Sequence, residues 1–354
     1  MAAVLTALGL VWANPIVDDY YLDTPQSLSL PPEAASVALA GALAGAGPGV
    51  AAAFYNPAAL AGLPRTEAAA SWGPWGTELW PGMSHAWAGF GFPAGKRLCV
   101  GIDASFTPRG EVEMIDEHGE YVGSLLMLDA TLGSRAALAL GEHCGVGAGL
   151  KLFLANSAGF PYQHGQLSWP MPPGEATATS ILADAGVLWT PSRRGGLGLS
   201  LCNAGPDIHY AAPDIRANWT AVPPWTVRLG GRLRMVEFGA TSVDLLAQVD
   251  GSVAPHRDWV MPEHESHSFM YRTARAIALD GLFWNFLSLR LGYMDGPTND
   301  RYGVTAGIGL RLWDVLRIDL ASDALTYTYM PRRTGIDWRL SIASSNLAGL
   351  WRRR

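Results

Sequence analysis

The chain has 354 residues, of which 49% are hydrophobic and only 16% are charged, and its formal net charge is −6 at pH 7. This charge excludes the broad basic surface that nucleic-acid binding requires. Few charges combined with 41 glycines and 14 tryptophans are unusual for a soluble enzyme and indicate contact with a membrane surface.

The first residues, MAAVLTALGLVWANP, form an apolar stretch that ends with small residues at Ala13. This arrangement is typical of a secretory signal peptide, although the usual basic residues before the apolar stretch are missing. We therefore predict a signal peptide over residues 1–13 and an exported protein.

A segment rich in Ala and Gly follows at residues 35–54. It is long enough for a membrane-spanning helix, but it lacks large apolar residues and contains a proline among glycines. We predict a buried, broken helical segment instead. Directly after it, Asn56 is a strong helix N-cap, Pro57 suits the first helical position, and Gly62 with Pro64 ends the helix. So short a helix is not stable alone, so another part of the protein must hold it.

From about residue 65 onward, apolar residues alternate with polar or small residues, which predicts β-strands with one apolar face. In residues 146–154, for example, valine, alanine and leucines share one face, and Gly147, Gly149 and Lys151 lie on the other. We expect roughly fourteen strands of a length that crosses a bilayer at a tilt. They lie near 66–73, 83–92, 97–107, 123–139, 142–154, 178–190, 195–204, 224–235, 240–251, 271–280, 284–294, 303–312, 315–324 and 335–345.

The connections between these strands alternate in length. The long loops fall near 107–122, 155–177, 205–223, 252–270 and 325–334, and short turns lie between them. Short turns at one end and long loops at the other are typical of outer-membrane β-barrels, whereas a soluble sandwich gives no reason for the pattern. Tryptophans fall near both ends of the strands, as two aromatic girdles would require.

The stretch AGPGVAAAFYNPAALAGL resembles the N-terminal segment of the FadL-like outer-membrane barrels, and more closely that of their PorV/PorQ branch. Further similar stretches follow in the same order at 105–138, 145–153, 183–189, 197–210, 223–234 and 287–296. The resemblance implies an all-β fold: a transmembrane antiparallel β-barrel of about 14 strands with an N-terminal helical hatch inside the lumen. We expect the hatch over 14–64, the barrel over 65–346 and a C-terminal tail over 347–354.

Two sets of residues are candidates for function inside such a barrel. The expected hatch residues are Phe54, Tyr55, Asn56, Pro57 and Leu60. The charged residues expected to line the lumen are Asp103, Asp184, Arg228, Arg232, Arg234, Asp244, Asp250, Arg290, Arg311, Arg317, Asp319, Asp337 and Arg339. Because these charges nearly balance, we interpret them as a structural network, with a pathway for a charged solute as the alternative.

Other motifs have simpler interpretations. His256, Asp258, Glu263, His264 and His267 share one predicted outer loop, but their spacing matches no H-E-x-x-H zinc motif. We interpret this loop as a surface for a partner and expect no metal.

The alternating glycines at 145–149 fit a lumen-facing strand rather than a phosphate-binding loop. The three cysteines are widely spaced, match neither a disulfide framework nor a C-x-x-C site, and are interpreted as small strand residues.

The stretch FTPRG at 106–110 has two interpretations. Pro108 ends the third strand at its outer loop, which we favour, or the third strand is kinked and opens a lateral exit, as in FadL-like barrels.

The resemblance to the PorV/PorQ branch implies a shuttle or scaffold of type IX secretion in the outer membrane of a diderm bacterium. Its outer loops would bind the translocon or the C-terminal domains of exported cargo. The alternative is a FadL-like channel for uptake or export of hydrophobic small molecules. An apolar pocket around Phe54, Tyr55 and Leu60 would favour the channel, and a tightly filled lumen with projecting loops would favour secretion.

Neither function needs a cofactor. The sequence holds no recognisable nucleophile elbow or catalytic triad, so we do not expect an enzyme. The expected partners are outer-membrane lipid together with either the secretion proteins or hydrophobic small molecules, and not nucleic acid.

Overall fold

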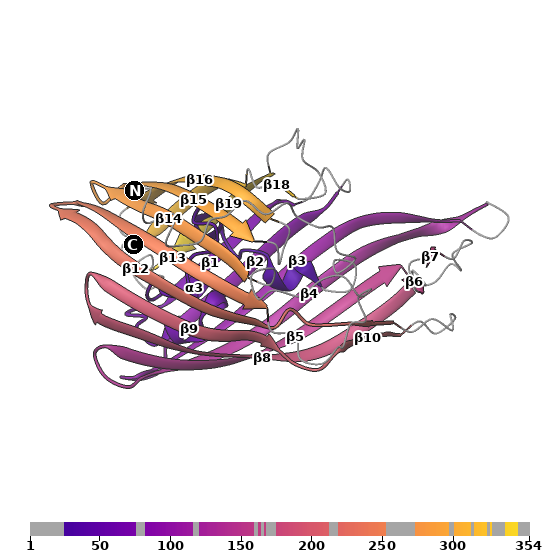
Figure 1. Cartoon of the computed structure of the whole chain (residues 1–354), viewed down its shortest axis with the longest axis horizontal. Helices are drawn as coiled ribbons and strands as arrows, with labels where there is room; N and C mark the ends of the chain where they lie inside the picture. Colours follow the sequence, from indigo (N-terminus) through magenta and orange to yellow (C-terminus); the bar gives the residue numbers. More distant parts are fainter. Residues whose placement is uncertain are drawn as a thin grey trace, which may run out of the picture.

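The structure of the chain, a computed structural model, is a closed antiparallel β-barrel with helical segments inside it (Figure 1). The described residues are 25–75, 82–115, 120–158, 162–163, 166–167, 175–211, 219–252, 273–296, 301–312, 315–323, 326–327 and 337–345. The predicted signal peptide, the histidine-containing loop near 256–267 and the C-terminal tail lie outside the described residues. The domain boundaries therefore stay predictions.

Fourteen long strands form the barrel wall, and each pairs with the next one along the chain. They are β1 (Glu67–Pro74), β2 (Ser84–Pro93), β3 (Leu98–Ile115), β4 (Tyr121–Ala139), β5 (Cys144–Ala158), β8 (Glu175–Ser192), β9 (Gly195–Ala204), β12 (Thr226–Phe238), β13 (Thr241–Ser252), β14 (Thr273–Phe283), β15 (Leu287–Gly296), β16 (Arg301–Leu312), β17 (Leu316–Asp323) and β19 (Asp337–Ser344). The last strand pairs with the first, with Ala69 opposite Ala343, and this pairing closes the barrel. The predicted fold class is confirmed.

Five short strands add to this wall or lie beside it. They are β6 (Tyr162–Gln163), β7 (Gln166–Leu167), β10 (Ile208–Ala211), β11 (Trp219–Ala221) and β18 (Thr326–Tyr327). β10 pairs with β8 and β11, β18 pairs with β16, and β6 and β7 pair only with each other.

The outer surface of the barrel is an apolar band. Side chains that point away from the lumen, such as Ile102, Leu229 and Leu291, are more than half exposed. Their chain neighbours Arg228 and Arg290 are buried inside. This alternation is what a bilayer requires of a transmembrane strand, because the lipid-facing side chains must be apolar.

Aromatic side chains mark both ends of this band. Trp72 and Trp338 lie near the long-loop end, where their rings form an edge-to-face contact with centroids 5.4 Å apart. Trp189 and Trp284 lie at the short-turn end and are 49% and 72% exposed. Exposed tryptophans in these positions fit the headgroup regions of a bilayer.

The wall is much taller on one side than on the other. β3, β4, β5 and β8 have 18, 19, 15 and 18 residues, and we call them the tall wall. β1, β17 and β19 have 8 residues each, and we call them the short wall. In Figure 1 the purple and magenta strands of the tall wall extend far beyond the yellow strands of the short wall.

The favoured interpretation of Pro108 was wrong, because β3 does not end there. The strand passes through a bulge and continues to Ile115. Pro108 pairs with Leu128 and Glu111 with Leu126, so residues 109 and 110 face a single residue of β4. Gly110 has a φ of 98°, a conformation that favours glycine. A proline is tolerated at this position because β3 is an edge here: its pairing with β2 reaches only to Phe106.

The described part of the hatch, residues 25–64, packs against the inner surface of the wall. It contains η2 (Gln26–Ser29), α2 (Ala34–Ala38), α3 (Val50–Tyr55) and η3 (Pro57–Leu60). α2 contacts β15, β16, β17 and β19, whereas η3 contacts β3, β4, β5 and β8. These buried pieces confirm the predicted broken helical segment. Among the described residues, no helix has the length and apolar character needed to cross a membrane.

Glycines on the inner faces of the strands let the hatch backbone touch the wall. A Cβ atom at Gly147 would lie only 2.5 Å from the backbone nitrogen of Ala58. A Cβ at Gly198 would overlap the carbonyl oxygen of Ala44. The alternating glycines around Gly147 therefore face the lumen as predicted, and they allow a backbone-to-backbone fit that no larger residue permits.

Candidate functional site

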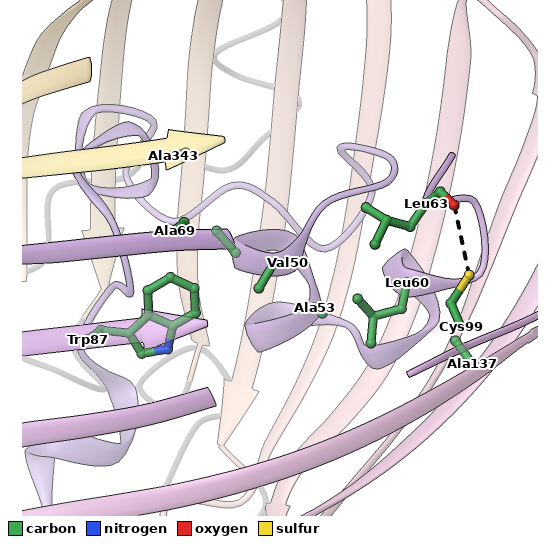
Figure 2. Packing of buried hydrophobic residues seen from close by; sticks show 10 residues of the cluster. Val50, Ala53, Leu60, Leu63, Ala69, Trp87, Cys99, Ala137 and Ala343 are labelled. Carbon is green, nitrogen blue, oxygen red and sulfur yellow. Dashed lines mark hydrogen bonds between the residues drawn. The ribbon is translucent and has the colours of Figure 1, made fainter. Parts of the chain in front are cut away.

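The expected hatch residues lie in two packed clusters rather than around one pocket. Phe54 and Tyr55 pack with Leu246 of β13 and neighbouring hatch residues. Leu60 belongs to a second cluster, which Figure 2 shows and which also contains Val50, Trp87 of β2 and Cys99 of β3. Each of these side chains is at most 8% exposed. These residues therefore fill the lumen and do not surround an apolar pocket, which is the arrangement that the sequence analysis linked to secretion.

Asn56 attaches the hatch to the wall as well as capping η3. Its Oδ1 accepts a hydrogen bond from the backbone N–H of Ala58 at 3.1 Å, which is the predicted N-cap contact. Its Nδ2 donates to the carbonyl oxygens of Ala44 and Val187, at 3.0 and 2.9 Å. Pro57 occupies the first position of η3, as predicted. The short helix is therefore held by the barrel wall.

Two buried cations face the aromatic side chains of the hatch. Lys151 Nζ lies 5.4 Å from the centroid of the Phe54 ring, and Arg228 Cζ lies 5.3 Å from that of Tyr55. Contacts of this type are stronger when both partners are removed from water. Burial raises the pKa of the Tyr55 phenol to about 12, so this side chain is neutral at physiological pH.

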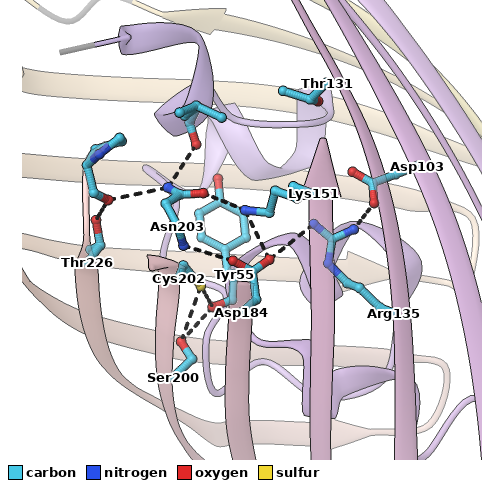
Figure 3. Close-up of polar contacts among 12 residues, drawn as sticks. Tyr55, Asp103, Thr131, Arg135, Lys151, Asp184, Ser200, Cys202, Asn203 and Thr226 are labelled. Atoms are coloured by element: carbon cyan, nitrogen blue, oxygen red, sulfur yellow. Dashed lines mark hydrogen bonds and ion pairs between the residues drawn. The ribbon is translucent and has the colours of Figure 1, made fainter. Parts of the chain in front are cut away.

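An ion cluster joins the strands of the tall wall (Figure 3). Arg135 pairs with Asp103 and, at 3.5 Å, with Asp184. Lys151 Nζ lies 3.0 Å from Asp184 and donates to Asn203 Oδ1 at 2.5 Å. Asp103 and Asp184 were expected in the lumen. Arg135 and Lys151 were missed, although both follow the same period-two pattern on the polar face of their strands.

A second ion cluster joins the hatch to the short wall. Asp319 is 1% exposed and accepts hydrogen bonds from Arg290 and Arg317, both at 2.6 Å. Arg317 also donates to both carboxylate oxygens of Glu33, at 2.8 and 2.7 Å, where Glu33 precedes α2. Arg290 pairs with Asp280 at 3.1 Å. Glu33 and Asp280 were not expected as site residues, because their roles depend on strand register and on the hatch position.

A third group of charges pairs directly across β12 and β13. Arg228 lies opposite Asp250, with Nε 3.2 Å from Oδ2. Arg234 lies opposite Asp244 at 2.8 Å, and Arg232 lies 3.7 Å from the same carboxylate. All five residues were expected in the lumen, and their side chains are at most one quarter exposed.

Three of the expected charges lie elsewhere on the wall. Arg339 on β19 donates to the carbonyl oxygen of Pro31 in the hatch. Arg311 lies opposite Arg317 in the pairing of β16 with β17, and Asp337 begins β19 opposite Asp323. The three ion groups favour the structural-network interpretation, because the acids and bases within them pair with one another inside the barrel.

The bulge in β3 is connected to the hatch through a buried carboxylate. Arg109 Nε lies 3.1 Å from Asp129 Oδ1, and its Nη2 donates to the carbonyl oxygen of Asn156 at 3.2 Å. Asp129 is 1% exposed, and its Oδ2 accepts from Ser27 Oγ of η2 at 2.7 Å. Sequence analysis identified the bulge region but missed Asp129 and Ser27.

An apolar cluster lies beside Asp129 on the inner face of the tall wall. We call it the Leu28 cluster, and its members are Leu28, Phe153, Ala155, Ala176, Ala178, Leu182, Ile208, Tyr210 and Ala221. Each is at most 7% exposed. This cluster was not expected from the sequence, where an apolar pocket around Phe54, Tyr55 and Leu60 was considered only as a sign of the channel alternative. The signal that was available is the run of alternating apolar residues on the inner face of β8.

The described residues offer no metal site. No group of three or more His, Cys, Asp or Glu side chains within them is placed to hold a metal ion. The five candidate zinc ligands of the 252–270 loop lie outside the described residues. Cys99, Cys144 and Cys202 are free thiols in β3, β5 and β9, in agreement with their interpretation as strand residues.

The fold is similar to that of several solved transporters and channels. The Ralstonia pickettii toluene transporter TbuX is 14% identical, with a TM-score of 0.51 over 88% of this chain and 97% of that chain. The Pseudomonas putida toluene transporter TodX is 13% identical (TM-score 0.52), over 88% and 96% of the two chains. CymD, a monoaromatic hydrocarbon channel, is 11% identical (TM-score 0.52) over the same shares. No protein-family model matches the sequence, and no curated protein is significantly similar to it.

These similarities show the fold. The chain has a FadL-like barrel of the outer-membrane type, with fourteen strands and short helical segments inside. TbuX and TodX are named as toluene transporters and CymD as a monoaromatic hydrocarbon channel. Identities of 11 to 14% are too low to assign the substrates of these proteins to this chain.

Proposed function

We propose that this protein is an outer-membrane channel for small hydrophobic molecules. The observation that carries the proposal is the bulge of β3 at residues 109–110, which lies beside the apolar Leu28 cluster on the inner wall. An apolar molecule inside the barrel and the lipid outside it are separated here by an interrupted strand. The TbuX, TodX and CymD structures, named as transporters or channels for toluene and monoaromatic hydrocarbons, support the same class of function.

The backbone pairing between β2 and β3 stops just before the bulge. Backbone pairing of the two strands ends at Ala86 and Phe106. One residue further along each strand, the His85 Nδ1 and Thr107 Oγ1 atoms share a hydrogen bond of 2.7 Å. A side-chain contact is easier to separate than a ladder of backbone hydrogen bonds, so this seam is the place where the wall would open towards lipid.

Uptake of toluene by cells of a host that lacks such a channel tests the proposal. We expect faster uptake when the wild-type chain is present. Deletion of Gly110 would give β3 and β4 a regular register, and we expect it to reduce uptake to the level of the host alone. Arg109→Lys is the matched control, because it keeps the bulge and the positive charge. Folding of each variant is checked by heat-dependent migration of the barrel in gels. Equal uptake with and without Gly110 would contradict the proposal.

Type IX secretion is the second candidate function. It rests on the sequence resemblance to the PorV/PorQ branch, and two observations favour it: the hatch packs closely against the inner wall, and the β3–β4 hairpin continues beyond the strands beside it. Among the described residues, β5 pairs with β4 only as far as Leu128. A hairpin with unpaired edges can bind an extended segment of another protein.

Purification of the tagged protein from its own outer membrane in a gentle detergent separates the two functions. Mass spectrometry that finds a giant translocon barrel, or secreted proteins with a common C-terminal domain, would support the secretion role. Apolar small molecules in the same fraction, without such proteins, would support the channel and exclude the shuttle.

A further inference from the structure

Among the described residues, one hatch side chain contributes to the Leu28 cluster. Leu28 belongs to η2, whereas the other members come from β5, β8, β10 and β11 on the tall wall. Leu28 is 2% exposed, and Phe153 and Leu182 are completely buried. Removal of Leu28 would therefore uncover a continuous apolar surface inside the barrel.

The turn that carries Leu28 has few polar attachments. Ser27 Oγ donates to Asp129, and the carbonyl oxygen of Leu28 accepts from Asn203 Nδ2 at 3.3 Å. η2 has only four residues, and Pro25 before it supplies no side-chain cap. Short helical turns of this kind are not stable alone. Among the described residues, moving Leu28 away from the wall breaks two hydrogen bonds, that of Ser27 with Asp129 and that of the Leu28 carbonyl oxygen with Asn203.

A buried hydroxyl group points into the same cluster. Ser180 lies on β8 between Ala178 and Leu182 on the same face, and it faces Phe153 in the strand pairing. The residue is 6% exposed, and its Oγ has no hydrogen-bond partner within the described part of the chain. Buried polar groups nearly always have a partner, and leaving one without a partner destabilises a protein. Within the described residues, the Ser180 hydroxyl thus lacks the hydrogen bond that a buried polar group normally makes.

We propose that the Leu28 cluster is a binding site for a neutral molecule with one aromatic ring and one hydroxyl group, such as a phenol or a benzyl alcohol. The ring takes the place of Leu28 against Phe153 and Leu182, and the hydroxyl pairs with Ser180. This inference rests on the proposed channel function and specifies the ligand class.

The charges around the site explain why the ligand is neutral. The nearest acid, Asp129, is paired with Arg109, and Lys151 is paired with Asp184. A carboxylate or an ammonium group placed against Phe153 and the alanines would lose its water without gaining a partner, which is costly. A neutral hydroxyl needs only the one hydrogen bond that Ser180 provides.

Binding of two probes of nearly equal size tests the inference. The full chain in lipid nanodiscs is titrated with 4-fluorophenol and with 4-fluorotoluene, and binding is followed by fluorine NMR against empty nanodiscs. We expect Ser180→Ala to weaken binding of 4-fluorophenol by about 2- to 10-fold, the worth of one hydrogen bond, without weakening binding of 4-fluorotoluene. Loss of both probes to the same extent, or of neither, would overturn the assigned ligand class.

Substitutions of Leu28 test the location of the site. Leu28→Trp fills the cluster, and we expect it to abolish binding of both probes. Leu28→Ala leaves space, and we expect both probes to bind more tightly. Leu60→Ala is the matched control: it is also a hatch leucine, 1% exposed, but it packs in a different cluster. If neither Leu28 variant changes the affinity for the two probes, the assigned location of the site is wrong.

The toluene uptake experiment separates this inference from the proposed function. Uptake that depends on Gly110, together with probe binding insensitive to Leu28 and Ser180, would refute the site and keep the channel. Absence of uptake would refute the channel itself, and the ligand class would then fall with it.

Discussion

The two ends of the hatch are held in different ways. Residues 44–60 contact the wall through backbone atoms that fit against glycines, and Asn56 adds one hydrogen bond to Val187 of β8 and two within the hatch. Within the part of the chain that the structure describes, η2 contacts the wall through the Leu28 side chain and through hydrogen bonds of Ser27 and of the Leu28 carbonyl oxygen. The difference indicates that one end is a fixed part of the barrel and that the other is the end that a ligand can move. The following predictions test this difference, from the largest expected effect to the smallest.

The largest effect is expected where a strand glycine meets the hatch backbone. Gly147→Ala places a methyl group against Pro57 and Ala58, neither of which can move aside as a flexible side chain would. We expect a loss of about 3 kcal/mol in the free energy of unfolding, measured by urea titration of the refolded barrel. Gly251→Ala is the control, because the nearest atom to its added methyl group is 4.0 Å away. Equal stability of the two variants would contradict the idea that residues 44–60 are fixed against the wall.

The next effect is expected at Asn56. Asn56→Ala removes the cap of η3 and leaves the buried carbonyl oxygens of Ala44 and Val187 without this donor. We expect a loss of about 2 kcal/mol in the free energy of unfolding. Hydrogen exchange should become faster at residues 57–61 and stay unchanged in η2. Faster hydrogen exchange in η2 alone would contradict the idea that Asn56 holds residues 57–61 in place.

A smaller effect is expected at the movable end. Ser27→Ala removes the hydrogen bond to Asp129, whose pairing with Arg109 remains. We expect a loss of only about 1 kcal/mol in stability, faster hydrogen exchange in η2, and toluene uptake at least equal to that of the wild type. Reduced uptake in a correctly folded Ser27→Ala barrel would contradict the idea that η2 restrains passage.

The smallest effect on stability is expected at the seam between β2 and β3. Thr107→Val removes the hydrogen bond with His85 at nearly constant volume. We expect a loss of less than about 1 kcal/mol, together with faster toluene uptake, because the seam then lacks the hydrogen bond between His85 and residue 107. Ser105→Ala, whose partner Thr131 belongs to β4 and not to β2, is the control that should leave uptake unchanged.

The barrel itself could be predicted because each strand faces lipid on one side and the filled lumen on the other. Lipid requires apolar residues such as Leu229 on one face, and the filled lumen admits Arg228 or glycine on the other. This constraint leaves a period of two that survives in the sequence. The N-cap at Asn56 was predictable for a similar reason, because capping is local along the chain.

The contacts inside the lumen could not be predicted in the same way. The partners of Asp319 and Asp129 come from strands or hatch residues far away in sequence, so they depend on register and on the path of the hatch. Pro108 was misinterpreted because a strand-ending proline and a proline beside a bulge have the same local sequence. Only the pairing of Glu111 with Leu126 distinguishes the two.

The contacts between the hatch and the last strands also bear on the order of assembly. Arg317 of β17 binds Glu33, and Arg339 of β19 binds the carbonyl oxygen of Pro31. β19 is also the strand that joins β1 and closes the barrel. The earliest part of the chain thus carries the binding groups for the latest strands, so the hatch can serve as an internal template around which the wall closes.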